Sequence, residues 1–229
     1  MTNSTPRASI SATPNDDARW DVLDASFLTA AMTEASMPPP TIAEVAFAGR
    51  SNVGKSSMMN ALMQRRALVR TSSTPGCTRG INMFHARTRG GLELNLVDLP
   101  GYGFAKRSKQ EKSTWGALIE QYLIGRPTLR AVLLLIDARR GLEADDHALI
   151  EFCSQKRPGN APVVVRVIAT KLDLVPKSKR KPTVDALAKS AGRPVHGFSA
   201  SEAIGRIEAW RAIERAALMG DAAPLKEPE

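Results

Sequence analysis

Eight consecutive residues, Gly49-Arg50-Ser51-Asn52-Val53-Gly54-Lys55-Ser56, have the clearest chemical potential in this chain. Their pattern, G-x-x-x-x-G-K-S, is that of a phosphate-binding loop. The glycines let the backbone wrap a phosphate chain, so that N–H groups and a following helix N-terminus point at it. Lys55 would neutralise β- and γ-phosphate oxygens, and the hydroxyl of Ser56 would ligate Mg²⁺. The alternative is a glycine-rich turn with an incidental lysine.

The sequence around this loop supplies the elements that the motif requires. The apolar run 45–48 precedes it and predicts a strand, and the helix-prone residues 57–66 follow it. In a parallel sheet, ligands bind at the carboxyl ends of the strands. We therefore expect the residues that follow each further strand to complete the site.

The tetrapeptide Asp98-Leu99-Pro100-Gly101 follows such an apolar run, at 92–97. Asp98 would hold Mg²⁺ through a water molecule, and the N–H of Gly101 would contact a γ-phosphate. Alone this D-x-x-G pattern is a weak signal, because Asp before a Pro-Gly turn is commonly turn chemistry. Its position after a strand favours the phosphate site.

The tetrapeptide Thr170-Lys171-Leu172-Asp173 follows the next but one predicted strand, at 163–169, and indicates the base. A carboxylate at Asp173 can accept both the N1–H and the exocyclic N2–H₂ of guanine. Adenine lacks these two donors and would leave the carboxylate unpaired. Lys171 would lay its aliphatic stem on the purine face. After the strand 194–198, the backbone N–H groups of residues 199–201 could bind guanine O6.

A hydroxyl-rich loop, residues 71–79, lies between the first helix and the strand 81–88. Several of its hydroxyls could complete the coordination of Mg²⁺, and we predict that Thr78 does so. A solvent-exposed Ser/Thr loop without a ligand is the alternative.

From residue 44 the chain alternates strands and helices, which predicts an α/β fold: a mostly parallel six-stranded sheet with one antiparallel edge strand and helices on both faces. The turn Gly90-Gly91 predicts a hairpin and places the antiparallel strand at that edge. The expected strands are 45–48, 81–88, 92–98, 131–137, 163–169 and 194–198. Further helices are expected around 115–123, where Trp115 is interpreted as core rather than as a cofactor-stacking residue, and at 202–218.

We expect three segments along the chain: a disordered or loosely docked N-terminal tail at 1–26, the main domain at 27–218, and a flexible C-terminal tail at 219–229. Residues 20–37 are apolar enough to dock on the domain as a strand or a helix, and their form stays open. The three prolines 38–40 mark a stiff boundary before the first certain strand.

The composition restricts the cellular location and the kinds of binding partner that we expect. Thirty-two Lys and Arg against 23 Asp and Glu give a net charge of +9, which favours a polyanion such as nucleic acid, although much of the excess could be solvated surface. The two cysteines and three histidines do not cluster, so a disulfide framework or zinc site is not expected. The longest apolar runs are too short for a membrane helix, and no secretory signal is apparent. We predict a cytoplasmic protein without a membrane partner.

Taken together, these residues resemble the translation-factor-related (TRAFAC) GTPases, and most closely the EngB (YihA/YsxC) family of ribosome-biogenesis GTP-binding proteins. The resemblance covers residues 27–218. The motifs that carry it are Gly49 to Ser57, Thr71 to Gly76, Thr78, Asp98 to Ala105, and Thr170 to Asp173. The run Pro100-Gly101-Tyr102-Gly103-Phe104-Ala105 is its most family-specific part.

Three positions depart from common GTPase patterns. Thr170 replaces the Asn more widely found before the base-reading Lys, and Thr suits this family. Cys77 and Gly80 stand where more polar residues would be expected, which affects the detail of that loop but not the assignment of Thr78.

The resemblance implies a P-loop GTPase G domain that uses GTP/GDP and Mg²⁺. It implies catalytic roles for Lys55, Thr78 and Gly101, and Mg²⁺ ligation by Ser56 and Thr78. The nucleotide-contacting residues that it implies are Gly49, Arg50, Ser51, Asn52, Val53, Gly54, Lys55, Ser56, Gly76, Cys77, Thr78, Arg79, Gly80, Asp98, Leu99, Pro100, Gly101, Thr170, Lys171, Leu172, Asp173, Phe198, Ser199 and Ala200.

For the biological role, the resemblance implies a nucleotide switch in assembly of the large ribosomal subunit, whose precursor rRNA would be the partner, and a requirement in cell division (septation) in some bacteria. We expect a monomer that does not bind DNA. The cations Lys106, Arg107, Lys109 and Lys112 follow the D-x-x-G loop, so ordering of that loop by γ-phosphate could present them to rRNA. A second basic run, 177–181, is interpreted as a solvated loop that could also touch RNA.

Two further expectations concern the rate of hydrolysis. Tyr102 occupies the position after D-x-x-G where many GTPases have a water-orienting Gln, which predicts slow intrinsic turnover and acceleration by a partner. Asn52 resembles a potassium ligand of cation-dependent GTPases, and the hypothesis is that K⁺ supplies the charge that an arginine finger would otherwise supply.

Two other function classes stay open from the sequence. One is a non-enzymatic basic RNA-binding protein in which the nucleotide is only structural. The other is a P-loop ATPase or kinase acting on a small molecule, against which the base-reading tetrapeptide 170–173 argues.

Overall fold

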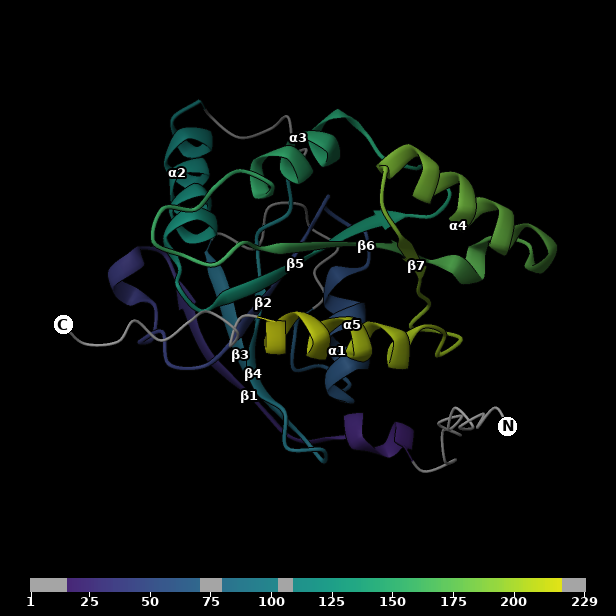
Figure 1. The fold of residues 1–229 in the computed structure, drawn as a ribbon, viewed down its shortest axis with the longest axis horizontal. Helices are drawn as coiled ribbons and strands as arrows, with labels where there is room; N and C mark the ends of the chain where they lie inside the picture. Colours follow the sequence, from purple (N-terminus) through teal and green to yellow (C-terminus); the bar gives the residue numbers. More distant parts are fainter. Residues whose placement is uncertain (1–15, 71–79, 103–108, 220–229) are drawn as a thin grey trace, which may run out of the picture.

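A computed structural model of the chain describes residues 16–70, 80–102 and 109–219. Within them, seven strands form one sheet (Figure 1). The strands are β1 (Val22–Ala31), β2 (Glu44–Gly49), β3 (Ile81–Thr88), β4 (Glu93–Asp98), β5 (Leu129–Asp137), β6 (Val164–Thr170) and β7 (Val195–Gly197). The α-helices are α1 (Lys55–Met63), α2 (Lys109–Gly125), α3 (Ala144–Cys153), α4 (Lys177–Ala191) and α5 (Arg206–Met219). Short 3₁₀ helices are η1 (Asp16–Trp20), η2 (Glu34–Ser36) and η3 (Leu172–Leu174).

The strand order is β1-β3-β4-β2-β5-β6-β7. Strands β4, β2, β5, β6 and β7 pair in parallel, whereas β3 is antiparallel to both β1 and β4. The α/β prediction is confirmed, and all six predicted strands are present. One detail differs: the sheet has seven strands, because β1 pairs antiparallel along β3 from Val22 to Ala31 and forms the edge.

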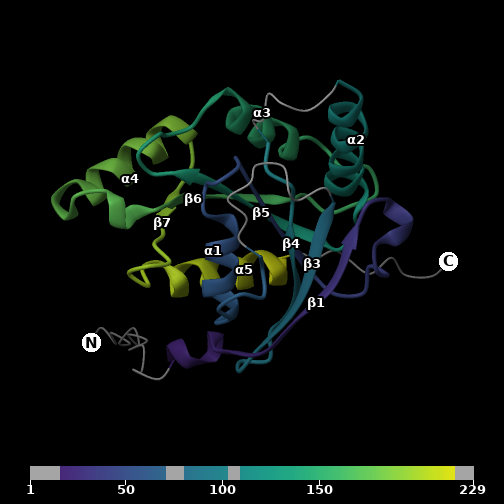
Figure 2. The same cartoon turned by 180° about the vertical axis from the view of Figure 1, so that it is seen from behind.

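The sheet separates two layers of helices (Figures 1 and 2). Buried side chains of α1 and α5 pack on one face, in a cluster that includes Met59 and Trp210. Side chains of α2, α3 and α4 pack on the other face, in a cluster that includes Leu123, Ile150 and Leu187. The sheet is therefore covered on both sides, as its continuous apolar strands require.

Strand β2 illustrates why these sequences form central strands. All six of its residues are buried. Val45 and Phe47 belong to the cluster on the α1 and α5 side, and Ala46 and Ala48 belong to the cluster on the opposite side. Alternate side chains of a strand point to opposite faces, so an apolar run without alternation is what a doubly covered strand needs. Strand β2 ends at Gly49, the first residue of the G-x-x-x-x-G-K-S motif.

The basic run 177–181 is not a loop as expected but the start of α4. Its charged side chains and Pro182 hide the helical pattern, because only Leu187 of this helix is buried. Helix α3 was not predicted either. The helices expected at 57–66, around 115–123 and at 202–218 correspond to α1, α2 and α5.

The segment before β2 is attached to the domain at two places. Near its start, Arg206 of α5 donates a 2.9 Å hydrogen bond to the carbonyl of Trp20, whose side chain is buried. Strand β1 then begins at Val22, so the predicted boundary between residues 26 and 27 falls inside a paired strand. Except for Met219, the predicted C-terminal tail lies outside the described residues.

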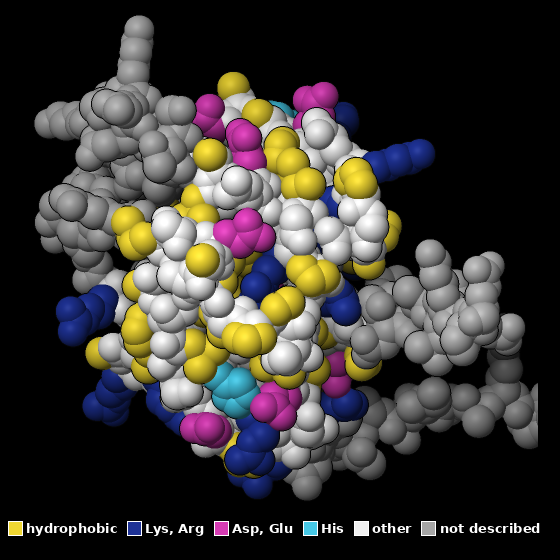
Figure 3. Space-filling view, turned by 90° about the vertical axis from the view of Figure 1, so that its left-hand side faces the viewer, with side chains coloured by type: hydrophobic (Ala, Val, Ile, Leu, Met, Phe, Trp, Pro, Cys, Tyr) yellow, Lys and Arg dark blue, Asp and Glu magenta, His cyan; other side chains and the backbone are white. Residues whose placement is uncertain are grey.

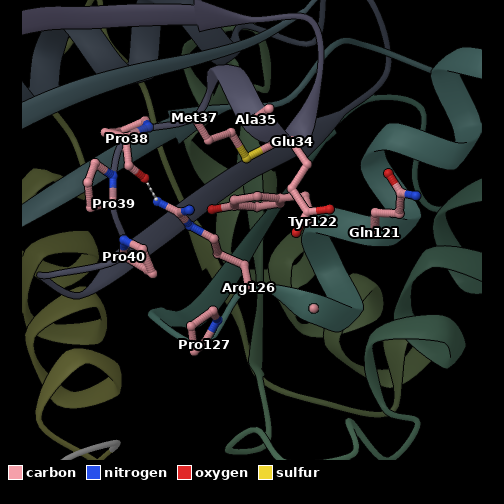
Figure 4. Close-up of a pocket in the computed structure, with 11 residues that line it drawn as sticks. Glu34, Ala35, Met37, Pro38, Pro39, Pro40, Gln121, Tyr122, Arg126 and Pro127 are labelled. Atoms are coloured by element: carbon pink, nitrogen blue, oxygen red, sulfur yellow. Dashed lines mark hydrogen bonds between the residues drawn. The ribbon is translucent and has the colours of Figure 1, made fainter.

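The second attachment is a buried cluster around Glu44 at the amino end of β2. Its fully buried carboxylate accepts hydrogen bonds from the Tyr122 hydroxyl (3.0 Å) and from Nε (2.9 Å) and Nη2 (2.7 Å) of Arg126. Arg126 Nη2 also donates to the carbonyl oxygen of Pro38 (2.7 Å), and a cavity of about 310 Å³ lies beside these residues (Figure 4). The cluster anchors the three prolines to α2, at the opposite end of β2 from the phosphate-loop motif.

Strand β1 leaves large side chains exposed at the edge of the sheet, among them Leu23, Phe27 and Leu28. Phe27 makes an edge-to-face contact with Phe84 of β3, with ring centroids 5.5 Å apart. Figure 3 views the side of the molecule formed by β1, η2 and α2, where hydrophobic side chains are interspersed with charged ones. Among the helices that the structure describes, none has the length and apolar character to cross a membrane.

Candidate nucleotide-binding site

The phosphate loop connects β2 to α1, as the motif predicts. At Gly49 a Cβ atom would lie 2.7 Å from the carbonyl oxygen of Leu135 on β5, so only glycine lets β2 approach its neighbour this closely here. Gly54 has φ +102°, a left-handed conformation that side chains disfavour, and is the N-cap of α1. Lys55 and Ser56 therefore occupy the first turn of α1, whose free N–H groups and dipole favour a phosphate.

The D-x-x-G segment lies against this loop. Lys55 Nζ forms an ion pair with Asp98 Oδ1, and the two side chains are only 10 and 3 % exposed. Asn82 of β3 donates to the other oxygen of Asp98 at 3.4 Å. At Gly101, a Cβ atom would lie 2.8 Å from Ser51 Oγ. The structure thus brings together the cation, the carboxylate and the glycine that the sequence assigned to a phosphate and metal site.

The donor set fits Mg²⁺ bound together with phosphates. Mg²⁺ is usually held through one or two protein groups and completes its coordination with waters and phosphate oxygens. Ser56 and Asp98 supply a hydroxyl and a carboxylate at this end of the sheet. Over the described ranges, no group of three or more His, Cys, Asp or Glu could hold a metal ion. The hydroxyl of Ser56 and the carboxylate of Asp98 suit a Mg²⁺ ion that is bound together with phosphates.

The residues predicted to read the base meet where β6 and β7 end. The Ser199 hydroxyl donates a 2.7 Å hydrogen bond to Asp173 Oδ1. Hydrogen bonds from Ser199 and Ser201 hold the pKa of the Asp173 carboxyl below its usual value, against a smaller opposing effect of desolvation. The carboxylate is therefore ionised and oriented at neutral pH, as an acceptor for two guanine donors must be.

Lys171 links the base-reading loop to the phosphate loop. It has φ +56°, and its Nζ donates to the carbonyl oxygen of Asn52 at 2.6 Å and lies 3.2 Å from Asp137 Oδ2. Asp137 in turn pairs with Arg139, and hydrogen bonds from Arg139 and Lys171 lower the pKa of this carboxyl. The extended stem of Lys171 thus spans the space between the two loops.

The side chain of Thr170 is hydrogen-bonded to the phosphate loop and to β5. Its side chain is buried, and Oγ1 lies 2.5 Å from the carbonyl oxygen of Val53 and 3.0 Å from that of Ile136. The hydroxyl therefore ties β6 to the phosphate loop and to β5. A direct contact of Thr170 with a nucleotide stays a prediction.

Backbone hydrogen bonds complete the connection between the two base loops. Leu172 N donates to Phe198 O (3.1 Å), and Phe198 N donates to Ala169 O (2.8 Å). Phe198 and Ser199 are buried, whereas Ala200 is exposed. This arrangement leaves the segment after β7 next to Asp173, where the sequence predicts an N–H contact with guanine O6.

One support of the base loop was missed in the sequence. Arg180 of α4 donates to the carbonyl oxygens of Val175 (3.0 Å) and Asp173 (3.4 Å) and forms a two-pronged ion pair with Glu202. It was predicted only as one member of a basic run. The sequence could not show this role of Arg180, because its partners are distant from one another along the chain. Asp173 and Val175 precede β7, whereas Glu202 follows it.

Part of the predicted site lies outside the described residues, namely Gly76, Cys77, Thr78 and Arg79. The same holds for Lys106 and Arg107 of the basic segment and for the side chains of Lys109, Lys112 and Trp115, the last of which we expect in the core. Gly80 is described: a Cβ atom there would lie 2.5 Å from the carbonyl oxygen of Ala31. Gly80 therefore lies against the end of β1.

A cavity of about 260 Å³ lies behind the phosphate loop, between Asn52, Lys171 and the start of α3. Arg50 and Tyr102 also line it. Arg50 forms an ion pair with Glu143, the N-cap residue of α3, and the Tyr102 hydroxyl is hydrogen-bonded to Asp146 of α3. The sequence identified the positions of these two residues in their motifs but not these partners.

Comparison with known proteins agrees with this geometry. Residues 44–171 match a family model described as "50S ribosome-binding GTPase". A "Probable GTP-binding protein EngB" of Desulforapulum autotrophicum is 41% identical over 196 residues, which are 84% of this chain and 96% of the relative. A protein of the same name from Geobacter metallireducens is 45% identical over 196 residues, 84% of this chain and 92% of the relative.

Among solved structures, the chain is similar to Era in complex with MgGDPNP and nucleotides 1506–1542 of 16S ribosomal RNA. The TM-score is 0.62 at 22% identity, and the match covers 82% of this chain and 59% of the Era chain. At that identity the similarity establishes the fold, a phosphate-loop GTPase domain.

Proposed function

The chain belongs to the EngB family of GTP-binding proteins, and on that basis we propose that it is a slow GTPase that acts as a nucleotide switch in assembly of the large ribosomal subunit. The single observation that carries the choice of nucleotide is the Asp173 carboxylate, oriented by Ser199 at the end of the sheet where the phosphate loop lies. Adenine offers this carboxylate no pair of donors.

The proposed roles of the residues follow from their positions. On nucleotide binding, Lys55 would exchange its ion pair with Asp98 for contact with the β- and γ-phosphates, and Asp98 would then be free to hold a metal-bound water. Ser56 and Thr78 would ligate Mg²⁺, and the N–H of Gly101 would contact the γ-phosphate. When bound, Mg²⁺ neutralises the charge that develops on the phosphate oxygens. The remaining residues assigned from the sequence orient the nucleotide through backbone N–H groups and the guanine contacts.

The slow rate is supported by Tyr102. The residue after D-x-x-G orients the attacking water in many GTPases, a task for which a carboxamide is suited. Here the Tyr102 hydroxyl is hydrogen-bonded to Asp146 at 2.5 Å. Burial, followed by Asp146, raises the pKa of Tyr102 far above its usual value, so the phenol stays protonated. A phenol held in this way neither orients nor activates water, and a partner would have to supply the missing contribution.

The ribosomal partner is supported by charge and by similarity. The chain has a net charge of +9, and Lys177, Lys179 and Lys181 are exposed in the first part of α4. These cations lie at a helix N-terminus, where the helix dipole disfavours them. A polyanion would offset that cost. Era, which shares this fold, was solved with 16S rRNA, and the matching family is described as binding the 50S particle. We propose that the rRNA of the large-subunit precursor is the partner of a monomeric, cytoplasmic protein that contributes to septation.

The first experiment measures phosphate release from GTP and from ATP by the purified protein, alone and with large ribosomal subunits. We expect slow release from GTP, faster release with subunits, and none above background from ATP. Lys55→Met should abolish release in both conditions. Release from ATP at the rate for GTP would favour the ATPase or kinase alternative.

The second experiment measures sedimentation of the protein with large-subunit precursors in the presence of GDP or of the β,γ-imido analogue of GTP. We expect co-sedimentation only with the analogue, and loss of it when Lys177, Lys179 and Lys181 are changed together to Gln. Equal binding with both nucleotides and no phosphate release would favour an RNA-binding protein with a structural nucleotide.

A further inference from the structure

Four residues form a closed ring of contacts between the phosphate loop, the D-x-x-G segment and α3. The backbones of Arg50 and Tyr102 form an isolated β-bridge. The Arg50 guanidinium pairs with the carboxylate of Glu143, the N-cap residue of α3. The N–H of Glu143 donates to Asp146 Oδ2 at 2.8 Å, and the Tyr102 hydroxyl donates to Asp146 Oδ1 at 2.5 Å. Each residue in the ring thus contacts the next.

Asp146 is the buried member of this ring on α3. Its side chain is 1% exposed, whereas its neighbour Asp145 is exposed to solvent. Both oxygens of Asp146 are used, one to cap the helix and one to hold Tyr102. The cap needs only one oxygen, so the contact with Tyr102 is additional to the role of Asp146 in starting α3.

The residue that Asp146 holds is the immediate neighbour of Gly101. Gly101 lies so close to Ser51 that a Cβ atom would be 2.8 Å from Ser51 Oγ. Tyr102 is bridged to Arg50, the residue before Ser51. An anchor on the Tyr102 side chain therefore limits the positions that the Gly101 N–H can take relative to the phosphate loop.

We propose that Asp146 is a positioning residue for GTP hydrolysis, which by holding the Tyr102 hydroxyl keeps the Gly101 N–H where a γ-phosphate would meet it. The inference rests on the proposed function, because it assumes that Gly101 contacts the γ-phosphate. It makes α3 a third element of the switch, together with the phosphate loop and the D-x-x-G segment. A partner that binds α3 would then alter hydrolysis without touching the nucleotide.

The proposal has a signature that a purely structural role lacks. GDP has no γ-phosphate, so its affinity does not depend on where Gly101 lies. GTP and its β,γ-imido analogue do depend on it. Loss of the anchor should therefore weaken the analogue selectively, whereas general damage to α3 or the phosphate loop should weaken both nucleotides and lower the melting temperature.

The experiment measures the affinity for GDP and for the β,γ-imido analogue by calorimetry, and the single-turnover rate of GTP hydrolysis, in the full chain. Tyr102→Phe removes only the hydroxyl. Asp146→Asn keeps an oxygen to cap α3 and weakens the contact with Tyr102. We expect the analogue affinity and the hydrolysis rate to fall about tenfold in each variant, as for loss of a hydrogen bond to a charged group, with GDP affinity and melting temperature unchanged.

The matched control is Asp145→Asn, which removes the same charge one residue away without breaking a hydrogen bond in the ring. It should behave as the original protein does. The double variant Tyr102→Phe/Asp146→Asn should be no weaker than either single variant, because both remove one contact.

Three outcomes would overturn the inference: an equal loss of GDP and analogue affinity, no change in either variant, or additive losses in the double variant. Failure of the original protein to hydrolyse GTP would instead overturn the proposed function. In that case the affinities still test whether Asp146 positions Gly101. A lower ratio of analogue affinity to GDP affinity in the variants than in the original protein would support it, and an unchanged ratio would contradict it.

Discussion

The Ser199 hydroxyl donates a 2.7 Å hydrogen bond to Asp173, so a residue that follows β7 orients the carboxylate that follows β6. Ser199 is fully buried and also accepts from the N–H of Glu202 at 3.1 Å. Its hydroxyl is therefore held in place and directs its proton to Asp173. If Asp173 reads the base as proposed, selectivity for the base depends on two loops rather than one.

Asp173→Asn should change the base that the protein binds. A carboxamide presents an NH₂ group where guanine also presents a donor, and it suits xanthine, which has an oxygen at that position. We expect GDP affinity to fall at least about 100-fold and XDP affinity to rise above it. Calorimetric titration with GDP, XDP and ADP measures this, with Asp185→Asn on the exposed face of α4 as the control. An unchanged preference for GDP would mean that another residue reads the base.

Ser199→Ala should weaken guanine binding without changing which base is preferred. The substitution removes the hydrogen bond that orients Asp173 but keeps the carboxylate. We expect GDP affinity to fall about tenfold, as for loss of a hydrogen bond to a charged group, with XDP still disfavoured. The comparison variant is Ser178→Ala on the exposed start of α4, and the same titrations apply. If Ser199→Ala binds GDP as tightly as the original protein, Asp173 does not need this support.

The pH dependence of GDP binding should differ between Ser199→Ala and the original protein. Ser199 is the largest cause of the lowered pKa of Asp173. Guanine binding needs the ionised carboxylate, so it is present above that pKa and is lost as the pH falls through it. Without Ser199 the pKa rises toward the usual value of about 3.9, and the loss should begin at a higher pH. Titrations of both proteins from pH 7 downward test this, because the protonation of GDP itself is common to both.

Glu44→Gln should destabilise the fold while leaving the nucleotide site intact. The carboxylate is fully buried and accepts hydrogen bonds from Arg126 and Tyr122, so its loss leaves the buried Arg126 guanidinium without a counter-charge. Removal of one partner from such a pair typically costs about 3 to 5 kcal/mol of unfolding free energy. Urea unfolding measures the effect. GDP affinity of the folded fraction should be unchanged.

The double variant Glu44→Gln/Arg126→Met provides the control for that experiment. If the cost arises from the unpaired cation, removal of both charges should destabilise the protein less than the two single changes added together. Strict additivity would contradict the interpretation.

Hydrolysis should be faster in K⁺ than in Na⁺. Asn52 has an exposed side chain and φ +62°, and its carbonyl oxygen accepts from Lys171. Its side-chain oxygen could ligate a cation beside the phosphates, where extra positive charge stabilises the developing anion. Single-turnover rates in KCl and NaCl of equal ionic strength test this, and Asn52→Ala should remove any difference. Equal rates in the two salts would contradict the potassium hypothesis.

The central strands and their motifs could be predicted from the sequence because they are local patterns. A continuous apolar run such as 131–137 is typical of a strand in a sheet that is covered on both faces. These residues lie within β5, and their side chains are buried on both sides of the sheet. The residues that follow β2, β4 and β6 lie at one end of the sheet, because parallel strands present their carboxyl ends together. These local patterns therefore identify the candidate site from the sequence.

Strand β1 and helix α4 could not be predicted with the same reliability. Strand β1 is an edge with exposed apolar side chains, so its sequence lacks both the continuous and the alternating pattern. Helix α4 rests on the sheet through few residues, with Leu187 as its buried side chain, so a charged sequence with an internal proline resembles a loop. For both segments, packing on the rest of the domain determines the structure.

The sequence by itself determined the phosphate loop, the candidate metal ligands and the carboxylate proposed to read guanine, because each lies within a few consecutive residues and depends on residue type. Only the tertiary structure decided which side chains hold those groups in place. Ser199 reaches Asp173, Arg180 reaches the carbonyl of the same residue, and Asp146 reaches Tyr102 from separate elements. Such contacts form between residues far apart in the chain, and their partners are set by how helices and strands pack rather than by spacing.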